Sequence, residues 1–185
     1  MTAMTGRAKS ILPSSQDGIK TEELPPSIQV VEFLLGKEHF AIDLFHVKEV
    51  VEYTRITELP NAPPHIRGII DLRGEITTII DIRQQMKIRQ DSDRDEINSR
   101  IIVLDNKITK SKIGIMVDDV LTVSTFVRAD VDSTVTSGVD EDLIIGIIRK
   151  KTRIRDSETT ELIIWIDIRN LLRENGQAVQ QGAFS

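Results

Sequence analysis

Short runs of apolar residues, each about as long as one strand, follow one another along most of the chain and are separated by turn residues. In several runs, such as residues 46–53, apolar and polar residues alternate. A period of two is typical of strands with one buried face, and the interruptions at Gly36-Lys37 and Arg73-Gly74 are typical of hairpins. The predicted strands cover residues 29–35, 38–44, 46–53, 68–72, 75–81, 100–106, 112–117, 120–127, 143–151 and 161–167.

The segments between the predicted strands are polar or charged. A short helix is expected at Asp81, because aspartate at the end of a strand is a good N-cap. The last two strands are expected to form a hairpin with a long charged connection. Both ends of the chain have the composition of flexible tails. The prediction is therefore one domain at residues 28–175, with tails at 1–27 and 176–185 and polar loops at 90–98 and 129–142.

Several of these patterns occur twice in the same order. Residues 40–50, FAIDLFHVKEV, align without gaps on residues 113–123, IGIMVDDVLTV. The tripeptides Gly-Ile-Ile at residues 68–70 and Asp-Ile-Arg at residues 81–83 recur after the second match, at 146–148 and 167–169. Ordered matches of this kind indicate two copies of one small β unit. The alternative is that strand–Gly–strand patterns recur through composition alone.

Composition favours a β protein without redox or membrane chemistry. The 185 residues are 39% hydrophobic but only 4% aromatic, so β-branched isoleucine and valine must fill the core. The formal net charge of −5 argues against a dedicated nucleic-acid binder, which needs a concentrated positive face. Cysteine is absent, and no apolar run approaches the roughly 20 residues that span a bilayer. These features, with no signal-peptide pattern, predict a soluble cytoplasmic protein.

Candidates for catalysis or metal binding are weak. The histidines His39, His46 and His65 do not have metal-ligand spacing, and no phosphate-binding glycine loop occurs. Acidic residues at 91, 93 and 95 imitate the start of a calcium loop, but Glu96 stands where that loop needs glycine. No catalytic residue, metal or cofactor is therefore predicted.

One block of the chain resembles a known family. Residues 59–83, LPNAPPHIRGIIDLRGEITTIIDIR, resemble the signature of the CheW family of chemotaxis coupling proteins. The similarity continues in EFLLGKEHFAIDLFHVKEVVEY, RIIVLDNKITKSKIGIMVDDVLTV, LIIGIIRKK and LIIWIDIRNLL, so it covers about residues 29–174. The resemblance implies a mainly β fold with two SH3-like five-stranded β-barrels packed side by side, with a groove between them and short helices. Units this small bury little alone, so a shared interface is expected to carry part of the core.

The resemblance also implies a function. CheW proteins are non-catalytic scaffolds that join the cytoplasmic tips of chemoreceptors to the histidine kinase CheA. A member of this family would bind the regulatory domain of CheA and a receptor at once, and would be recruited from the cytoplasm to receptor arrays at the membrane. No cofactor is implied.

Several residues are candidates for these contacts. Glu49 and Arg73 match family positions associated with partner binding, and an ion pair between them is expected to order the edge of the first barrel. Arg67 and Arg73 flank one strand, whose ends are expected to leave both side chains free. Asp71 stands where the family usually has asparagine, and is expected to compete with Glu49 for Arg73. A pair without a partner role would contribute at most about 1 kcal/mol.

Glycines and apolar residues form a second group of candidates. Gly68 and Gly146 precede matching strands, and each is expected to serve a positive φ or a close approach of a partner's backbone. Four apolar residues are expected to line the groove between the barrels and receive a receptor helix, with plain core burial as the alternative for each. These residues are Val47, Val120, Val123 and Ile144.

Two other functions remain open from the sequence. The same features would also fit a CheW-like paralogue that serves a non-flagellar sensory pathway. An SH3-like barrel could also bind nucleic acid through Lys107, Lys110, Lys112 and the basic residues at 149–155, although stacking aromatics are missing.

Overall fold

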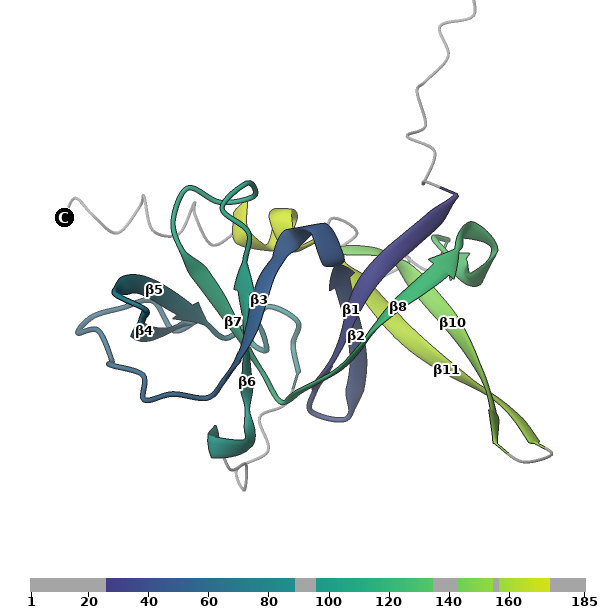
Figure 1. The fold of residues 1–185 in the computed structure, drawn as a ribbon, viewed down its shortest axis with the longest axis horizontal. Coiled ribbons are helices and arrows are strands. Elements are labelled where there is room, and N and C mark those ends of the chain that lie inside the picture. The colour runs from purple at the N-terminus through teal and green to yellow at the C-terminus, as the bar shows by residue number, and fades with distance from the viewer. Residues whose placement is uncertain (1–25, 89–95, 135–142, 155–156, 174–185) are drawn as a thin grey trace, which may run out of the picture.

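The computed structural model describes residues 26–88, 96–134, 143–154 and 157–173, which form two β-sheets with little helix (Figure 1). Nearly all of both predicted tails, and most of the loops at 90–98 and 129–142, lie outside the described residues. The strands are β1 (Ser27–Leu35), β2 (Glu38–Asp43), β3 (Val47–Glu52), β4 (Ile66–Leu72), β5 (Glu75–Ile80), β6 (Arg100–Leu104), β7 (Ile113–Val117), β8 (Asp119–Val127), β9 (Val131–Asp132), β10 (Ile144–Ile154) and β11 (Ser157–Ile166). The short helices are η1 (Leu44–His46), η2 (Glu96–Asn98), η3 (Arg128–Asp130) and a helix at residues 168–173.

The strands divide into a six-stranded sheet A and a five-stranded sheet B. Sheet A has the order β8-β1-β2-β11-β10-β9, and sheet B has the order β3-β6-β7-β5-β4. Figure 1 shows the two sheets as two lobes, with β3 to β7 in one and the remaining strands in the other. The predicted mainly β class with two barrel-like units is therefore confirmed.

The two sheets are built from two copies of the same unit, as the repeated patterns predicted. The order of sheet B, β3-β6-β7-β5-β4, becomes the order β8-β1-β2-β11-β10 of sheet A when each strand is replaced by its counterpart in the other copy. The parallel pairings also correspond, because Ile79 lies opposite Gly114 as Trp165 lies opposite Ala41. Each sheet thus takes its first hairpin, β1-β2 or β6-β7, from the opposite copy. The two copies have exchanged hairpins.

Each sheet is closed at the same point by a short backbone pairing. In sheet B, Thr57 pairs with Ile69 of β4 outside the named strands. In sheet A, Asp132 of β9 pairs with Ile147 of β10. A register shift lies next to each closure, in the pairing of β4 with β5 and of β10 with β11. β9 is therefore the counterpart of the single bridge in sheet B.

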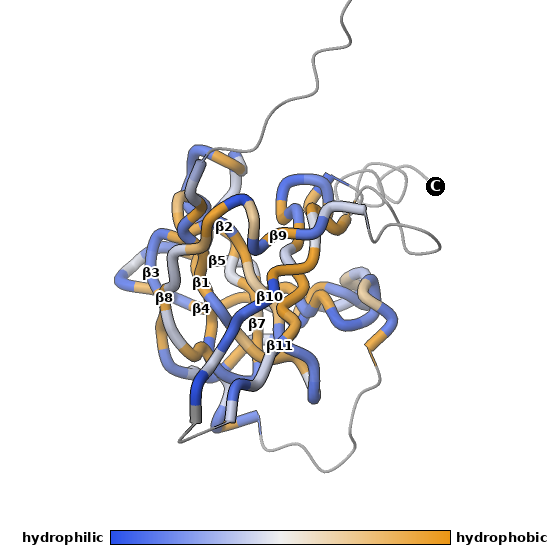
Figure 2. The backbone as a smooth tube through the Cα atoms, turned by 90° about the vertical axis from the view of Figure 1, so that its right-hand side faces the viewer, coloured by the Kyte–Doolittle hydropathy of each residue, from blue (hydrophilic) through white to orange (hydrophobic). Residues whose placement is uncertain are grey.

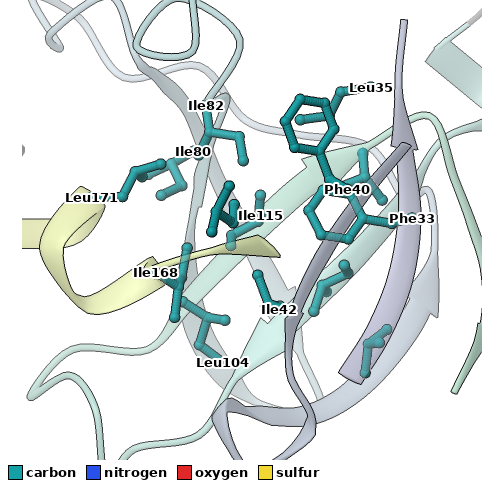
Figure 3. Packing of buried hydrophobic residues seen from close by; sticks show 14 of the residues in the cluster. Phe33, Leu35, Phe40, Ile42, Ile80, Ile82, Leu104, Ile115, Ile168 and Leu171 are labelled. Atoms are coloured by element: carbon teal, nitrogen blue, oxygen red, sulfur yellow. The ribbon is translucent and has the colours of Figure 1, made fainter. Parts of the chain in front are cut away.

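One apolar cluster lies between the sheets and joins them (Figure 3). Because successive side chains of a strand point to opposite faces, a strand such as β6 contributes Ile102 to this central cluster and Ile101 to the interior of sheet B. β1, β2 and β7 are likewise buried on both faces, which explains their nearly continuous apolar runs. The buried members of the central cluster are Val31, Phe33, Leu35, Phe40, Ile42, Ile80, Ile82, Ile102, Leu104, Ile115, Val117, Leu143, Ile166, Ile168 and Leu171.

A buried arginine ties the two sheets together. The side chain of Arg83, which follows β5, is only 4% exposed and donates to Asp81 at 2.8 Å and to Asp118 at 2.6 Å. Asp118 lies before β8 and also accepts from the backbone N–H of Gly36, in the turn between β1 and β2. Arg83 therefore connects the end of a sheet B strand to the first hairpin of sheet A.

The second copy has a weaker version of this contact. Arg169 corresponds to Arg83, but it is exposed and donates from Nε to Nε2 of His46 at 3.0 Å. Burial, followed by the charge of Arg169, lowers the pKa of His46, which favours the neutral imidazole that can accept this bond. The two contacts between the sheets thus differ in burial and strength.

Two local predictions differ from the structure. The helix expected at Asp81 is a set of turns that ends at Lys87, whose φ of 53° is left-handed. Its counterpart after Asp167 is a true helix, and Oδ1 of Asp167 accepts from the N–H of Arg169 at 2.9 Å. The long charged connection expected between the last two strands is mostly strand, because β10 continues to Ile154 and β11 begins at Ser157. None of the helices among the described residues is long and apolar enough to cross a bilayer.

Replacing Gly68 by alanine is predicted to lower the free energy of unfolding by about 2–5 kcal/mol. Gly68 has a φ of 143°, and an added Cβ would lie 2.2 Å from the carbonyl oxygen of Thr57. Gly146→Ala is the matched control, since its Cβ would lie 3.0 Å from the carbonyl oxygen of Asp132. This variant should lower the free energy of unfolding by less than about 2 kcal/mol. Urea unfolding measures both, and equal losses would contradict the explanation.

Replacing Arg83 by methionine is predicted to lower the free energy of unfolding by about 3–5 kcal/mol, because it removes the guanidinium that pairs with the buried carboxylate of Asp81 and with Asp118. The exposed counterpart, Arg169→Met, should cost no more than about 1 kcal/mol. The comparison uses chemical denaturation at neutral pH. A small effect of Arg83→Met would show that the buried pairs do not hold the sheets together.

Candidate functional site

The turn between β4 and β5 presents an arginine at the edge of the molecule. Arg73 and Gly74 have φ values of 55° and 82°, so both are left-handed, as a two-residue hairpin turn requires. Oδ1 of Asp71 accepts from the N–H of Gly74 at 2.6 Å and closes the turn. The predicted reversal at Arg73-Gly74 is confirmed.

Arg73 forms the predicted ion pair with Glu49 of β3. Nη1 and Nη2 of Arg73 lie 3.2 Å and 2.8 Å from Oε1 and Oε2 of Glu49. The side chain of Arg73 is 74% exposed and that of Glu49 is 20% exposed. The expected competition from Asp71 is wrong, because that carboxylate is used by the turn. The pair joins both edge strands of sheet B, and we call these two residues and the turn the Glu49–Arg73 surface.

The surroundings of this surface carry both signs of charge. Glu75, the first residue of β5, accepts a hydrogen bond from the ammonium group of Lys112. That bond, with the charges of Lys112 and Lys48, lowers the pKa of Glu75, so its carboxylate is ionised at neutral pH. Arg73 is thus an exposed cation of a surface that also holds the carboxylates of Glu49, Asp71 and Glu75.

Arg67, at the other end of β4, is not free as its position suggested. Its Nη2 lies 2.5 Å from Oε1 of Glu96 in η2, and the two side chains are 36% and 42% exposed. Its Nε is buried without a hydrogen-bond partner among the described residues. Arg67 is therefore held by its own chain, and its contact with another protein stays a prediction.

The predicted apolar contact residues differ in exposure. Val47 and Val120 are half-buried and pack against the central cluster, so core packing accounts for most of their surface. Val123 of β8 is 53% exposed, and Ile144 of β10 is half-buried. Among the four, Val123 presents the most side chain to a partner.

The internal repeat identifies one residue that was missed. Val50 of β3 is the counterpart of Val123 in the gap-free alignment of residues 40–50 with 113–123, and it is 41% exposed. The two valines correspond in the structure as well, because Val50 lies opposite Ile102 and Val123 lies opposite Val31, both members of the central cluster. Other exposed large apolar residues are Phe45, Leu59, Ile76, Ile97, Leu121, Val127 and Leu162. We call Val47, Val50, Val120 and Val123 the valine faces.

The two candidate glycines serve the fold. Both lie at the closure of a barrel, and the backbone that approaches Gly68 most closely is that of Thr57 in the same chain. Gly146 is approached in the same way by Asp132. Gly68 has the expected positive φ and Gly146 does not, while a contact of either glycine with a partner's backbone stays a prediction.

The residues considered for metal and nucleic-acid binding can be placed in the structure. Within the described ranges, no group of three or more histidine, aspartate or glutamate side chains is placed to hold a metal ion. The basic residues considered for nucleic acid are divided between sheets, with Lys112 bonded to Glu75 on sheet B and Arg149 to Asp132 on sheet A.

Comparisons with known proteins agree with the sequence and the fold. The family model of the CheW-like domain matches residues 29–176. Chemotaxis protein CheW of Treponema pallidum (strain Nichols) is 33% identical over 128 residues, which cover 67% of this chain and 74% of that protein. Chemotaxis protein CheW of Bacillus subtilis (strain 168) is 28% identical over 127 residues, or 69% of this chain and 78% of that protein.

A solved structure is also similar. The crystal structure of scaffolding protein TtCheW from Thermoanaerobacter tengcongensis matches with a TM-score of 0.64 and 28% sequence identity, and covers 84% of this chain and 93% of that chain. The chain belongs to the CheW family. The predicted family, and with it the role of a chemotaxis adaptor that works with chemoreceptors and CheA, is confirmed. CheW proteins are non-catalytic adaptors.

Changing Asp71 to asparagine, the residue usual in this family, is predicted to alter the free energy of unfolding by less than about 0.5 kcal/mol. Asparagine keeps the Oδ1 acceptor that closes the turn on the N–H of Gly74. Asp71→Ala removes that acceptor and should cost about 0.5–1.5 kcal/mol. Urea unfolding of both variants tests this, and equal costs would show that the hydrogen bond is not what Asp71 contributes.

Proposed function

We propose that this CheW-family chain holds a chemoreceptor tip and the regulatory domain of CheA at the same time, through two separate surfaces. The observation that carries the proposal is the Glu49–Arg73 ion pair, which fixes an exposed arginine at the edge of sheet B. In this proposal the Glu49–Arg73 surface binds CheA, and the valine faces bind the receptor.

The geometry of Arg73 supports its role in the kinase contact. The left-handed turn and the two-point pair with Glu49 hold the guanidinium in one position before a partner arrives. Ordering a long side chain on binding costs about 0.5–1.5 kcal/mol, so an arginine that is already ordered binds more tightly. Its remaining exposed N–H groups can reach a carboxylate or carbonyl of CheA.

The valine faces support the receptor contact. Val50 and Val123 are exposed on corresponding edge strands, and Val47 and Val120 beside them border the central cluster between the sheets. Short branched side chains of this kind suit the apolar face of an amphipathic helix, such as one strand of a receptor coiled coil. The proposal places the adaptor in the cytoplasm, at receptor arrays.

Two surfaces on one rigid body explain how an adaptor without catalysis transmits a signal. The central cluster and Arg83 fix sheet A relative to sheet B. A change in the receptor that favours one placement of the adaptor then also changes the placement of the bound kinase. The coupling between receptor and kinase is the difference in binding free energy between the two receptor states.

Arg73→Glu is predicted to weaken binding to the isolated regulatory domain of CheA by about tenfold or more, since each lost charge-assisted bond is worth roughly 1.5–3 kcal/mol. Calorimetry with the purified partner measures the affinity. Arg128→Glu, the same reversal at an exposed arginine of η3, is the control and should leave the affinity unchanged. Equal weakening by both variants would point to net charge alone.

A charge swap separates the partner contact from the internal pair. Glu49→Arg combined with Arg73→Glu restores an ion pair within the chain but places the wrong sign toward CheA. Binding should remain weak in the swapped protein, and full recovery would show that Arg73 serves only the fold.

The double variant Val50→Lys, Val123→Lys should weaken receptor binding and leave CheA binding unchanged. The reverse pattern would exchange the two assignments.

A further inference from the structure

The last hairpin of the chain is longer than its barrel requires. β10 and β11 contain 11 and 10 residues, whereas their counterparts β4 and β5 contain 7 and 6. The shorter hairpin closes sheet B with the same strand order. The extra length in sheet A is therefore an addition to the barrel, and Figure 1 shows the hairpin projecting from the body of the molecule.

The projecting part adds no buried apolar side chain to the core among the described residues. Ile148 and Ile163 are fully buried, but the described side chains beyond them, toward the tip, are exposed or half-buried. β9 pairs only with Ile147 and Ile148, and β2 pairs with β11 only at Ile164 and Trp165. From Arg149 outward the hairpin is a two-stranded ribbon with both outer edges free of these neighbours. We call residues 149–154 and 157–162 the ribbon.

One face of the ribbon carries a row of cations. Arg149, Lys151 and Arg153 occupy alternate positions of β10, so their side chains leave the same face at intervals of about 7 Å. The register places Leu162, Thr160 and Glu158 opposite them on β11. Figure 2 shows the change along β10 from hydrophobic residues in the barrel to hydrophilic residues in the ribbon.

These cations are only partly neutralised. Arg149 is bonded to Asp132 and is 55% exposed, and Lys151 lies 3.7 Å from Glu158 and is 72% exposed. Arg153 has no ion-pair partner within the described ranges. Exposed pairs of this kind contribute little stability, so the row is not explained by the fold.

Lys150, on the other face, shows the contrast with a structural lysine. It donates to both oxygens of Glu32, at 3.0 Å and 2.8 Å, and that carboxylate is fully buried inside sheet A. Burial acts to raise the pKa of Glu32, but hydrogen bonds from Lys150 and Ser124 and the charges of Lys150 and His39 lower it on balance. Lys150 holds the fold, whereas its neighbours point away from it.

We propose that the cationic face of the ribbon is a third interaction surface, which docks on a carboxylate-rich segment of a partner protein. A row of cations that the fold does not use, on a chain with a formal net charge of −5, is complementary to such a segment. Thr160 and the 60% exposed Leu162 give the same face hydroxyl and apolar contacts that suit a protein. The described ribbon has no aromatic residue on which bases could stack, which disfavours a single-stranded nucleic acid as the occupant.

The test measures binding of the full chain to a fluorescein-labelled peptide of alternating glutamate and serine, by anisotropy over a range of salt concentrations. A peptide with glutamine in place of glutamate is the probe control. The ribbon variant replaces Arg149, Lys151 and Arg153 by glutamine. The matched protein control replaces Lys37, Lys107 and Arg128 by glutamine, which removes the same charge from exposed positions elsewhere.

The parent chain is expected to bind the acidic peptide and not the glutamine peptide. The affinity for the acidic peptide should be about tenfold weaker in the ribbon variant and unchanged in the control variant. Salt should weaken the binding because exposed charges are screened. Both variants should keep the urea midpoint of the parent chain. Equal weakening in both variants, or no binding to the acidic peptide, would overturn the proposal. A third outcome would also overturn it. If the parent chain bound phosphatidylglycerol vesicles or oligo-dT but not the acidic peptide, and the ribbon variant lost that binding, the surface would recognise phosphates. The test needs neither CheA nor a receptor, so its failure would leave the proposed adaptor contacts standing.

Discussion

The burial of β1, β2, β6 and β7 on both faces is the constraint on which the rest of the structure depends. Each of these strands lines a barrel with one face and the central cluster with the other. A small barrel buries too little apolar surface to be stable alone, and the central cluster supplies the remainder. Because close-packed interiors deform little, this arrangement also fixes the two barrels relative to each other. Arg83 adds a polar contact to the same junction.

The interaction surfaces depend on this frame. β3 and β8 are edge strands that pack against the central cluster with Val47 and Val120, while Glu49 and Val123 of the same strands remain partly exposed. Arg73 lies on a turn of two residues that leaves its backbone little freedom. The side chains proposed to bind partners therefore stand on packed strands and a tight turn, where their positions relative to one another are set by the core. An adaptor whose output is geometry needs this property.

Much of this fold could be predicted from the sequence, because alternation and turn residues are local signals. They located the strands, the Arg73-Gly74 turn and the repeat, and they placed Glu49 on a strand and Arg73 at a hairpin tip where the two could pair. The role of that pair in partner binding came from the family resemblance. The burial of Arg83 could not be predicted, since it depends on Asp118, which is distant in the chain. The outer part of the ribbon, residues 152–154 and 157–160, was mistaken for a connection because its residues are mostly polar or charged, and only pairing with the facing strand reveals it. The exchange of hairpins could not be predicted from the sequence either, because the hairpin of each copy fits the same local pattern.

The exchanged hairpins have a consequence for how the molecule can vary. Two separate copies of one repeat would reach the same packing as a twofold dimer with swapped hairpins, and every surface would then occur twice. In a single chain the twofold relation is only approximate, so each half can change alone. Arg83 is buried where Arg169 is exposed, and the short turn that carries Arg73 corresponds to the long basic ribbon. The molecule therefore has the arrangement of a hairpin-swapped dimer without exact symmetry, and its two related ends differ in length and in charge.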